Sequence, residues 1–241
     1  MARRFDQYCP IAHALSLVGE RWALLIVREL LEGPKRYTDL AGGLPGIGTN
    51  ILATRLRELE QAGVVRRHKL PPPAASTVYE LTEYGAGLEE PMHALARWGA
   101  RTLGPPGPDD EFDPDWGLNA FPALLNPELA RGLTETYVIR AGSDAFTIRL
   151  EDGVLDVELG AAEEADLRVE MTIETFFALA SGDVDPRDAA ARGDLAFAGD
   201  PDVLARLFRI FSFAPREAPR AGARAHASAA EDRFSRPTAA G

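Results

Sequence analysis

The sequence contains little cysteine and no long apolar run. Its single cysteine among 241 residues excludes a disulfide within one chain. No stretch approaches the roughly 20 apolar residues that a membrane-spanning helix needs, and residues 1–6 lack the apolar core of a signal peptide. We therefore predict a cytoplasmic protein that has no membrane as a partner.

Catalytic motifs are also missing. The four histidines are scattered without the spacing of metal ligands, and no glycine-rich phosphate loop follows a predicted strand. The cysteine has no partner at C-x-x-C spacing. We therefore predict that the protein is not an enzyme and has no metal or cofactor.

Positive charge is scarce overall and unevenly distributed. The formal net charge is −11. Residues 1–104 contain 13 Lys or Arg against 11 Asp or Glu, residues 105–214 contain 8 against 23, and residues 215–241 contain 5 against 3. Only cations that reach phosphates contribute to DNA affinity. A nearly neutral first segment with a local basic cluster can therefore bind DNA while the acidic segment faces away.

Residues 48–63 have the apolar spacing of an amphipathic helix, because Leu52, Leu56, Leu59 and Gly63 fall on one face. The opposite face carries mostly short or hydrogen-bonding side chains, namely Asn50, Ala53, Thr54, Arg57 and Gln61. In the major groove Asn pairs with adenine, Arg pairs with guanine, and a Thr methyl group contacts thymine. This face is therefore either a base-contacting surface or an ordinary solvated one.

The segment after this helix favours the base-contacting interpretation. Residues 64–70 form a β-prone run that contains Arg66, Arg67, His68 and Lys69. A proline-rich turn and a second β-prone run, residues 76–81, follow. Two short strands joined by a turn predict a hairpin, and a cationic hairpin beside an exposed polar helix is typical of a winged helix.

The flanking segments complete a mostly helical domain. A helix begins at Pro10 and continues with apolar three- and four-residue spacing to Leu30, with a break expected at Gly19. Residues 36–40 begin the first helix of a helix-turn-helix, with Thr38 or Asp39 as its cap, and residues 42–46 form the turn. Thr82 opens a further helix that Pro91 should kink or divide. The apolar face of that helix carries Leu88, Met92, Leu95 and Trp98.

Several short motifs occur in order over residues 9–101. They are Cys9-Pro10-Ile11, Gly19-Glu20-Arg21-Trp22, Arg28-Glu29-Leu30-Leu31, Arg36-Tyr37-Thr38-Asp39-Leu40, Leu56-Arg57-Glu58-Leu59-Glu60, Gly63-Val64-Val65 and Tyr79-Glu80-Leu81-Thr82. Taken together, these motifs resemble the HxlR family of bacterial winged-helix regulators. One departure is Gly48 and Thr49, where many relatives have a serine cap, although Gly or Thr also serves. The resemblance implies a dimeric, sequence-specific DNA-binding repressor or activator.

The family also implies that the N-terminal helix and the helix from Thr82 build a dimer interface, although Met92 and Trp98 are equally compatible with an intramolecular core. We predict that Asn50, Thr54 and Arg57 contact base edges and that Arg66, Arg67 and Lys69 contact phosphates. Further candidates for the interface with double-stranded operator DNA are Lys35, Arg36, Thr49 and Arg55.

Composition predicts two domains and a linker. Residues 104–115 contain four prolines, two glycines and five carboxylates, which cannot form a core. We therefore predict a winged helix domain in residues 1–103, a linker in residues 104–115 and a second domain in residues 116–214. Residues 215–241 are rich in Ala, Arg and Pro without apolar periodicity, which predicts a disordered tail.

The second domain has the pattern of an α+β fold. One or two short helices are expected in residues 116–125, and alternating residues with turns at 142–144 and 152–153 predict an antiparallel meander over residues 137–159. Further strands are expected at residues 167–171 and 195–199. Helices should begin after the caps Thr172, Asp185 and Asp200. Strands followed by helices imply an antiparallel sheet covered by helices.

This domain resembles the sterol carrier protein fold in its meander, in residues 193–200 and in the helix of residues 201–211. That resemblance implies a hydrophobic tunnel for an apolar or amphipathic small-molecule effector. Each large apolar residue could equally be ordinary core. The candidate ligand-binding residues are Phe146, Ile148, Phe176, Phe177, Leu204, Leu207, Phe208 and Phe211.

Two alternatives remain open at the level of sequence. The chain is either a regulator of transcription or a lipid- or metabolite-binding carrier that uses the winged helix only as a dimerisation scaffold. Cys9, just before Pro10, is either an inert residue at a helix start or a reactive thiol. The helix N-terminus favours the thiolate, and some HxlR relatives sense oxidants or electrophiles through a cysteine at a similar position.

Overall fold

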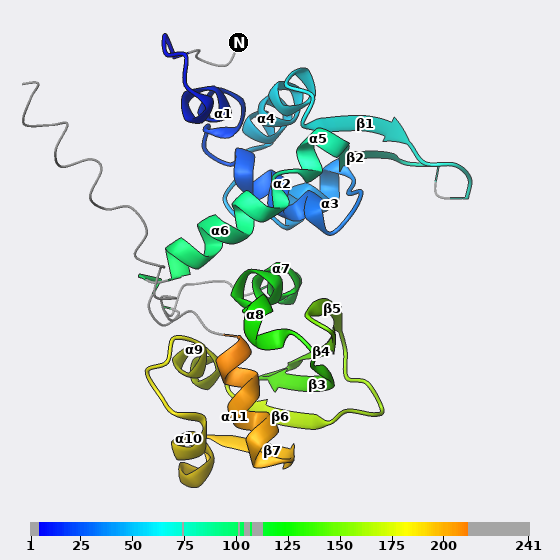
Figure 1. Cartoon of the computed structure of the whole chain (residues 1–241). Helices are drawn as coiled ribbons and strands as arrows, with labels where there is room; N and C mark the ends of the chain where they lie inside the picture. Colours follow the sequence, from blue (N-terminus) through cyan, green and yellow to red (C-terminus); the bar gives the residue numbers. More distant parts are fainter. Residues whose placement is uncertain (1–4, 74, 101, 104–106, 108–112, 212–241) are drawn as a thin grey trace, which may run out of the picture.

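The computed structural model describes residues 5–73, 75–100, 102–103, 107 and 113–211. Two separate hydrophobic cores divide these residues into an N-terminal domain, residues 5–103, and a C-terminal domain, residues 113–211 (Figure 1). The predicted tail and most of the predicted linker lie outside the described residues. Asp113 caps a helix that starts at Pro114, so the end of the predicted linker already belongs to the C-terminal domain.

The N-terminal domain has the elements that the sequence predicts. Its helices and strands are α1 (Pro10–Val18), α2 (Ala23–Leu31), α3 (Tyr37–Gly42), α4 (Thr49–Gln61), β1 (Val65–Lys69), β2 (Thr77–Leu81), α5 (Glu83–Ala86) and α6 (Glu89–Ala100). The core lies between α2, α3 and α4, where Ile26, Leu40 and Leu56 are fully buried. The predicted apolar stripe of α4 is confirmed, because Leu52, Leu56 and Leu59 are its buried residues.

Two predicted helices are divided. The first ends at Val18 and breaks at Gly19, as expected, and the axes of α1 and α2 are bent by 80° relative to each other. The helix from Thr82 breaks at Gly87 and Leu88, before Pro91 rather than at it. Pro91 thus lies in the first turn of α6, where its missing N–H group removes no helical hydrogen bond.

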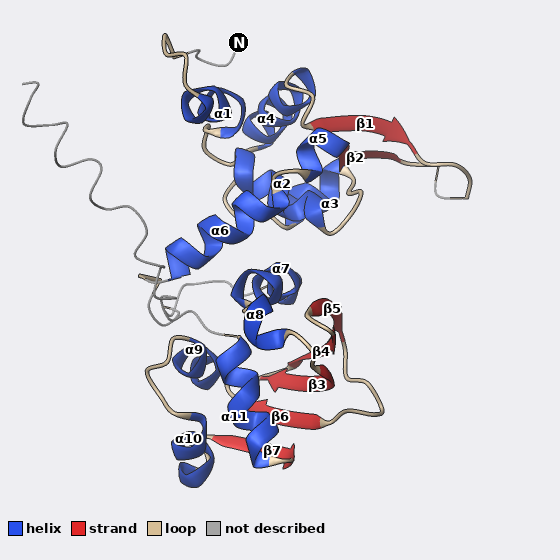
Figure 2. Ribbon diagram, viewed as in Figure 1, coloured by secondary structure: helices blue, strands red, loops and turns tan. Residues whose placement is uncertain are grey.

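In the C-terminal domain, helices cover a five-stranded sheet (Figure 2). Its elements are α7 (Pro114–Leu124), α8 (Pro127–Ala130), β3 (Thr134–Ala141), β4 (Asp144–Glu151), β5 (Val154–Leu159), β6 (Leu167–Met171), α9 (Ile173–Ala180), α10 (Pro186–Arg192), β7 (Leu195–Gly199) and α11 (Pro201–Ile210). The predicted caps are confirmed, since Thr172, Asp185 and Asp200 each accept a hydrogen bond from a backbone N–H of the helix that follows.

The sheet is not wholly antiparallel, which corrects the prediction. Its strand order is β5-β4-β3-β6-β7, and β6 pairs with β3 in parallel while the other pairs are antiparallel. The meander ends at the edge strand β5, and residues 160–166 carry the chain back across the sheet to the free side of β3. Hydrophobic alternation identifies each strand but does not determine this pairing.

The core of the C-terminal domain lies between the sheet and its helices. Tyr137 and Ile148 from the sheet and Leu204 and Leu207 from α11 are almost fully buried there. Phe121 of α7 makes edge contacts with the rings of Phe146, Phe176 and Phe211, at centroid distances of 5.4, 5.9 and 5.7 Å. Thus α7 is an integral part of this core.

Among the described residues, no single helix is long and apolar enough to cross a membrane; α1 and α2 reach the required length and composition only when taken together across their bend.

Candidate nucleic-acid interface

The polar face of α4 is open along most of its length. Asn50, Arg57 and Gln61 are exposed, and so is Thr49 at the first helical position. Ala53 and Thr54 are half-buried, and the Thr54 Oγ1 donates to the backbone oxygen of Asn50 at 2.8 Å. This bond leaves the Thr54 methyl group as the part that can contact a base. The predicted face is therefore present, with Asn50 and Arg57 as its most accessible members.

A hydrogen bond connects α4 to α3. The Tyr37 hydroxyl donates to the backbone oxygen of Thr49 at 2.7 Å, which connects the first turn of α3 to the first turn of α4. At the start of α3, the backbone N–H of Arg36 donates to Asp39 Oδ2 at 3.0 Å. Arg36, not Thr38 or Asp39, is the N-cap residue, and its side chain is exposed. The role of Tyr37 was not predicted because its partner is a backbone atom.

The predicted wing is an antiparallel hairpin. β1 and β2 pair from Val65 opposite Leu81 to Lys69 opposite Thr77, and the hairpin projects away from the helices (Figure 1). Its base is attached to the segment before α3, because the backbones of Lys35 and Tyr79 exchange hydrogen bonds of 3.0 and 2.8 Å. The wing and the helix-turn-helix therefore form one unit.

The wing cations differ in how they are engaged. Arg66 forms an ion pair with Glu80 on the opposite strand. The Arg67 guanidinium carbon lies over the Tyr79 ring, 5.9 Å from the ring centroid. Lys69 is exposed and forms no ion pair with the residues that the structure describes. All three are accessible to a phosphate, but Lys69 would give up no partner on binding one.

Two of the predicted DNA ligands are held elsewhere. Lys35 Nζ forms ion pairs with Glu29 at 2.9 Å and Glu32 at 2.6 Å. Arg55 pairs with Glu58 on α4 and with Glu20 at 3.2 Å. Their side chains are only 18% and 19% exposed. Lys35 and Arg55 are thus engaged in ion pairs within the N-terminal domain. This geometry does not favour either side chain as a phosphate ligand.

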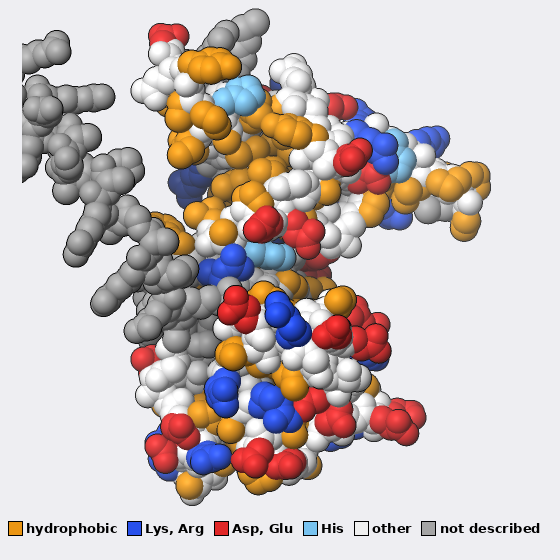
Figure 3. All heavy atoms as spheres, viewed as in Figure 1, with side chains coloured by type: hydrophobic (Ala, Val, Ile, Leu, Met, Phe, Trp, Pro, Cys, Tyr) orange, Lys and Arg blue, Asp and Glu red, His pale blue; other side chains and the backbone are white. Residues whose placement is uncertain are grey.

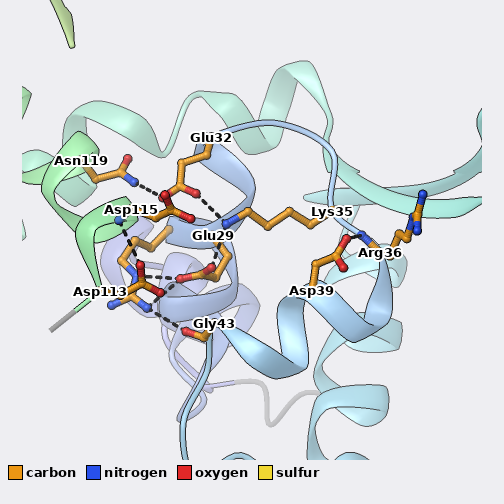
Figure 4. Close-up of polar contacts among 10 residues, drawn as sticks. Glu29, Glu32, Lys35, Arg36, Asp39, Gly43, Asp113, Asp115 and Asn119 are labelled. Atoms are coloured by element: carbon orange, nitrogen blue, oxygen red, sulfur yellow. Dashed lines mark hydrogen bonds and ion pairs between the residues drawn. The ribbon is translucent and has the colours of Figure 1, made fainter. Parts of the chain in front are cut away.

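The carboxylates that hold Lys35 form an unpredicted cluster at the end of α2 (Figure 4). Glu29 is only 2% exposed and accepts from both Arg28 and Lys35. Burial raises the pKa of Glu32, although Lys35 opposes that rise. From sequence these residues resemble an ordinary solvated charge pattern, so no local signal distinguishes them. We call Arg28, Glu29, Glu32 and Lys35 the α2 charge cluster.

The exposed apolar side chains of the N-terminal domain form a second surface. Figure 3 shows hydrophobic side chains gathered over α1 and toward α6. Ile11 and Leu15 of α1 and Leu95 and Trp98 of α6 are exposed, whereas Met92 packs against the core. Between α1 and α5 lies an open pocket of about 520 Å³. Its lining residues include Ala14, Leu17, Val18, Val64, Tyr84 and Leu88.

Cys9 directly precedes α1, one of the two helices that carry this apolar surface. It is the N-cap residue of α1, is half-buried and has a free thiol. Its side chain makes no capping hydrogen bond, and its backbone oxygen accepts from the N–H of His13 at 2.9 Å. The structure thus locates the thiol at a helix start, as the sequence predicts.

The predicted ligand-binding residues lie together in the C-terminal domain. Phe146, Ile148, Leu204, Leu207 and Phe211 are buried against one another. Phe176, Phe177 and Phe208 are half-buried on α9 and α11. Among the described residues, no group of three or more His, Cys, Asp or Glu side chains could hold a metal ion.

A polar face on the second helix of a helix-turn-helix, joined to a cationic hairpin, defines a winged helix-turn-helix DNA-binding protein. Residues 17–106 match the model of the HxlR-like helix-turn-helix family. The sequence is 40% identical to the HTH-type transcriptional regulator YodB of Bacillus subtilis over 91 residues, which cover 37% of this chain and 81% of that regulator. The chain therefore belongs to the HxlR family of DNA-binding transcriptional regulators, as the sequence predicts.

Further similarities cover a comparable share of the chain. The regulator YtfH of Escherichia coli is 36% identical, with 39% of this chain and 75% of that protein covered. A solved structure of reduced YodB is 36% identical and covers 42% of this chain and all of that chain, with a TM-score of 0.37. Each of these matches leaves more than half of the present chain uncovered.

The C-terminal domain has a separate match. Residues 111–216 fit the family described as alkyl sulfatase C-terminal. That description differs from the sterol carrier fold that the sequence predicts, so the sterol carrier resemblance stays a prediction.

Proposed function

We propose that the protein is a homodimeric, sequence-specific regulator that inserts two α4 helices into successive major grooves of operator DNA. Asn50 and Arg57 would contact base edges, Thr54 would contribute its methyl group, and Arg66, Arg67 and Lys69 would contact phosphates. The observation that carries this proposal is that the side chains of Asn50 and Arg57 are exposed near the wing and form no ion pair or side-chain hydrogen bond with the residues that the structure describes.

The apolar surface of α1 and α6 supports a dimer. Trp98 is 70% exposed and Ile11 is 71% exposed, and α6 has no fully buried residue. Continuous apolar patches of this kind mark interaction sites on soluble proteins. A second copy is the partner that fits, because a two-fold dimer doubles the base contacts that one short helix can make.

Selection from random-sequence duplexes with the full chain tests the proposal. The expected result is enrichment of a two-fold symmetric sequence whose half-sites are centred one helical turn, about 34–36 Å, or a multiple of this apart. Enrichment of unpaired half-sites would contradict the dimeric arrangement. Absence of any enriched sequence would favour the alternative, a lipid- or metabolite-binding carrier.

We also propose that an apolar or amphipathic small molecule binds between α9 and α11 and modulates DNA binding. The half-buried rings of Phe176, Phe177 and Phe208 support this location, because they are the least tightly enclosed of the predicted residues. Thermal-shift measurements with fatty acids, sterols and aromatic metabolites should show stabilisation of the full chain that Phe177→Trp abolishes. No stabilisation by any compound would leave these residues as core.

Redox sensing through Cys9 is a further proposal that rests on its place at the start of α1. A disulfide between two Cys9 residues of a dimer would lock α1 against its copy. If Cys9→Ser responds to diamide in the same way as the natural protein, this role is excluded.

We propose that the chain is not an enzyme, which the regulator names of its curated relatives support. Release of inorganic sulfate from an alkyl sulfate by the full chain would contradict this proposal.

A further inference from the structure

Helix α7 has one face in the core of the C-terminal domain. Phe121 occupies the centre of an aromatic cluster there. Gly117 lies so close to the sheet that a Cβ atom at this position would be 2.7 Å from the Phe146 ring. The helix therefore moves with the C-terminal domain as a rigid part of it.

The other face of α7 contacts the N-terminal domain at the α2 charge cluster (Figure 4). The Arg28 guanidinium lies 4.4 Å from the centroid of the Trp116 ring, which is the geometry of a cation–π contact. Asn119 Nδ2 donates to Glu32 Oε1 at 2.8 Å. At the end of α7, Arg97 of α6 donates to the backbone oxygen of Ala123 at 3.2 Å.

The α2 charge cluster also contacts the DNA-binding elements. Arg28 Nη2 donates to the backbone oxygen of Gly43, at the end of α3, at 3.4 Å. A Cβ atom on Gly43 would be 2.3 Å from Glu29 Oε2, so the carboxylate and the turn into α4 are in close contact. Lys35 joins the cluster through its side chain and the wing through its backbone. One set of side chains thus connects α7, the helix-turn-helix turn and the base of the wing.

The α2 charge cluster depends on its ion pairs and hydrogen bonds, because it contains a buried carboxylate. Glu29 is buried and Lys35 is half-buried beside it. Glu29 is stabilised only while its ion pairs are kept, because an unpaired buried charge is costly. The Trp116 ring packs against the Arg28 guanidinium, and Asn119 donates a hydrogen bond to Glu32. Removing them would admit water and loosen the side chains that hold Gly43 and Lys35.

We propose that Trp116 and Asn119 are positioning residues for DNA recognition, through which the docked C-terminal domain holds the helix-turn-helix and wing in their DNA-binding arrangement. Docking leaves the interface open, because the C-terminal domain and α4 lie on opposite sides of α2 and α6 (Figure 1). This inference rests on the proposed DNA-binding function and assigns its regulation to a specific contact between the domains.

The test compares four full-length variants with the natural protein: Trp116→Ala, Asn119→Ala, Trp116→Phe, which keeps a ring beneath Arg28, and Glu128→Ala on the exposed surface of α8. Binding is measured by fluorescence anisotropy to the duplex obtained by selection and to a scrambled duplex of the same composition. Thermal unfolding by circular dichroism checks that each variant is folded.

Trp116→Ala and Asn119→Ala should each lower affinity for the selected duplex by about fivefold or more, the lower end of measured coupling between sites. Affinity for the scrambled duplex should fall less, because only the phosphate contacts of the wing contribute to it. Trp116→Phe and Glu128→Ala should bind both duplexes like the natural protein. Unchanged or tighter binding of the selected duplex by both alanine variants, when they are folded, would overturn the inference. If the natural protein does not distinguish the two duplexes, the proposed function fails instead.

Discussion

The two domains treat their apolar residues in opposite ways. Among the residues that the structure describes, ten of the thirteen exposed large apolar side chains belong to the N-terminal domain and three to the C-terminal domain. The C-terminal domain buries its aromatic residues against one another around Phe121. The N-terminal domain leaves the apolar faces of α1 and α6 open, which is what a surface completed by a second copy requires.

Charge separates the domains in the same direction. The segment with the winged helix has a net charge of +2, and residues 105–214 have −15. The basic wing and the open face of α4 are therefore suited to DNA, while the acidic domain is not. We infer that the N-terminal domain provides the surfaces for partners. The C-terminal domain is a closed unit that packs against the N-terminal domain through α7.

The largest effect is expected from opening the closed core. Phe121→Ala should destabilise the protein by about 3–5 kcal/mol, because it removes a ring that contacts three others and leaves a cavity. Urea unfolding followed by circular dichroism measures this change. A loss below about 1 kcal/mol would mean that the aromatic cluster can collapse around the cavity and is not rigid.

The second prediction concerns the exposed apolar surface of α1 and α6, where a charged side chain should weaken dimerisation. Trp98→Glu should weaken the dimer by about 2 kcal/mol or more, as expected for an aromatic residue at the centre of an interface. Sedimentation equilibrium measures the dimer dissociation constant. Leu129→Glu on α8 is the matched control, since Leu129 is an exposed apolar residue outside this surface. Equal effects of the two substitutions would remove the argument for an α1 and α6 interface.

Within the DNA interface, the wing cations should differ. Lys69→Ala should reduce the slope of log affinity against log salt concentration by about 2 per dimer. Each protomer would then release about one counterion fewer on binding. Arg66→Ala should have a smaller effect because Arg66 must give up Glu80 before it neutralises a phosphate. Binding titrations at several salt concentrations provide the slopes. A larger change for Arg66→Ala would reverse this assignment.

The smallest effect concerns pH. Burial raises the pKa of Glu32 above its ordinary value of 4.5, so the folded chain binds more protons than the unfolded chain between 4.5 and the raised pKa. Stability therefore falls as pH rises through this window. The melting temperature of the natural protein relative to Glu32→Gln should fall between pH 4.5 and pH 7. A constant difference between the two would show that Glu32 titrates normally.

Sequence predicts the local parts of this architecture well. The stripe of Leu52, Leu56 and Leu59, the hairpin wing and the caps at Thr172 and Asp200 depend on short-range periodicity or on one side chain and its next turn. The residues that determine each of these features lie within a few positions of one another in the sequence. The exposed face of α4 follows from the same periodicity.

The features that sequence did not predict join distant residues. Asn119 and Glu32 are 87 positions apart, and Arg55 pairs with Glu20 over 35 positions. Sequence therefore predicts that Lys35 and Arg55 are available for phosphates, whereas the fold places carboxylate partners beside both. The parallel pairing of β6 with β3 also joins residues that are distant in sequence. The alternation of apolar residues along a strand does not specify which strand lies beside it.

The central claim is that α4 of the N-terminal domain determines sequence specificity, and the affinity of Arg57→Ala for the selected and scrambled duplexes tests it most directly. The account predicts a loss of roughly 1–3 kcal/mol on the selected duplex and little change on the scrambled one, as for a side chain that contacts a base edge. Equal losses on both duplexes would contradict it, because Arg57 would then contact only phosphates.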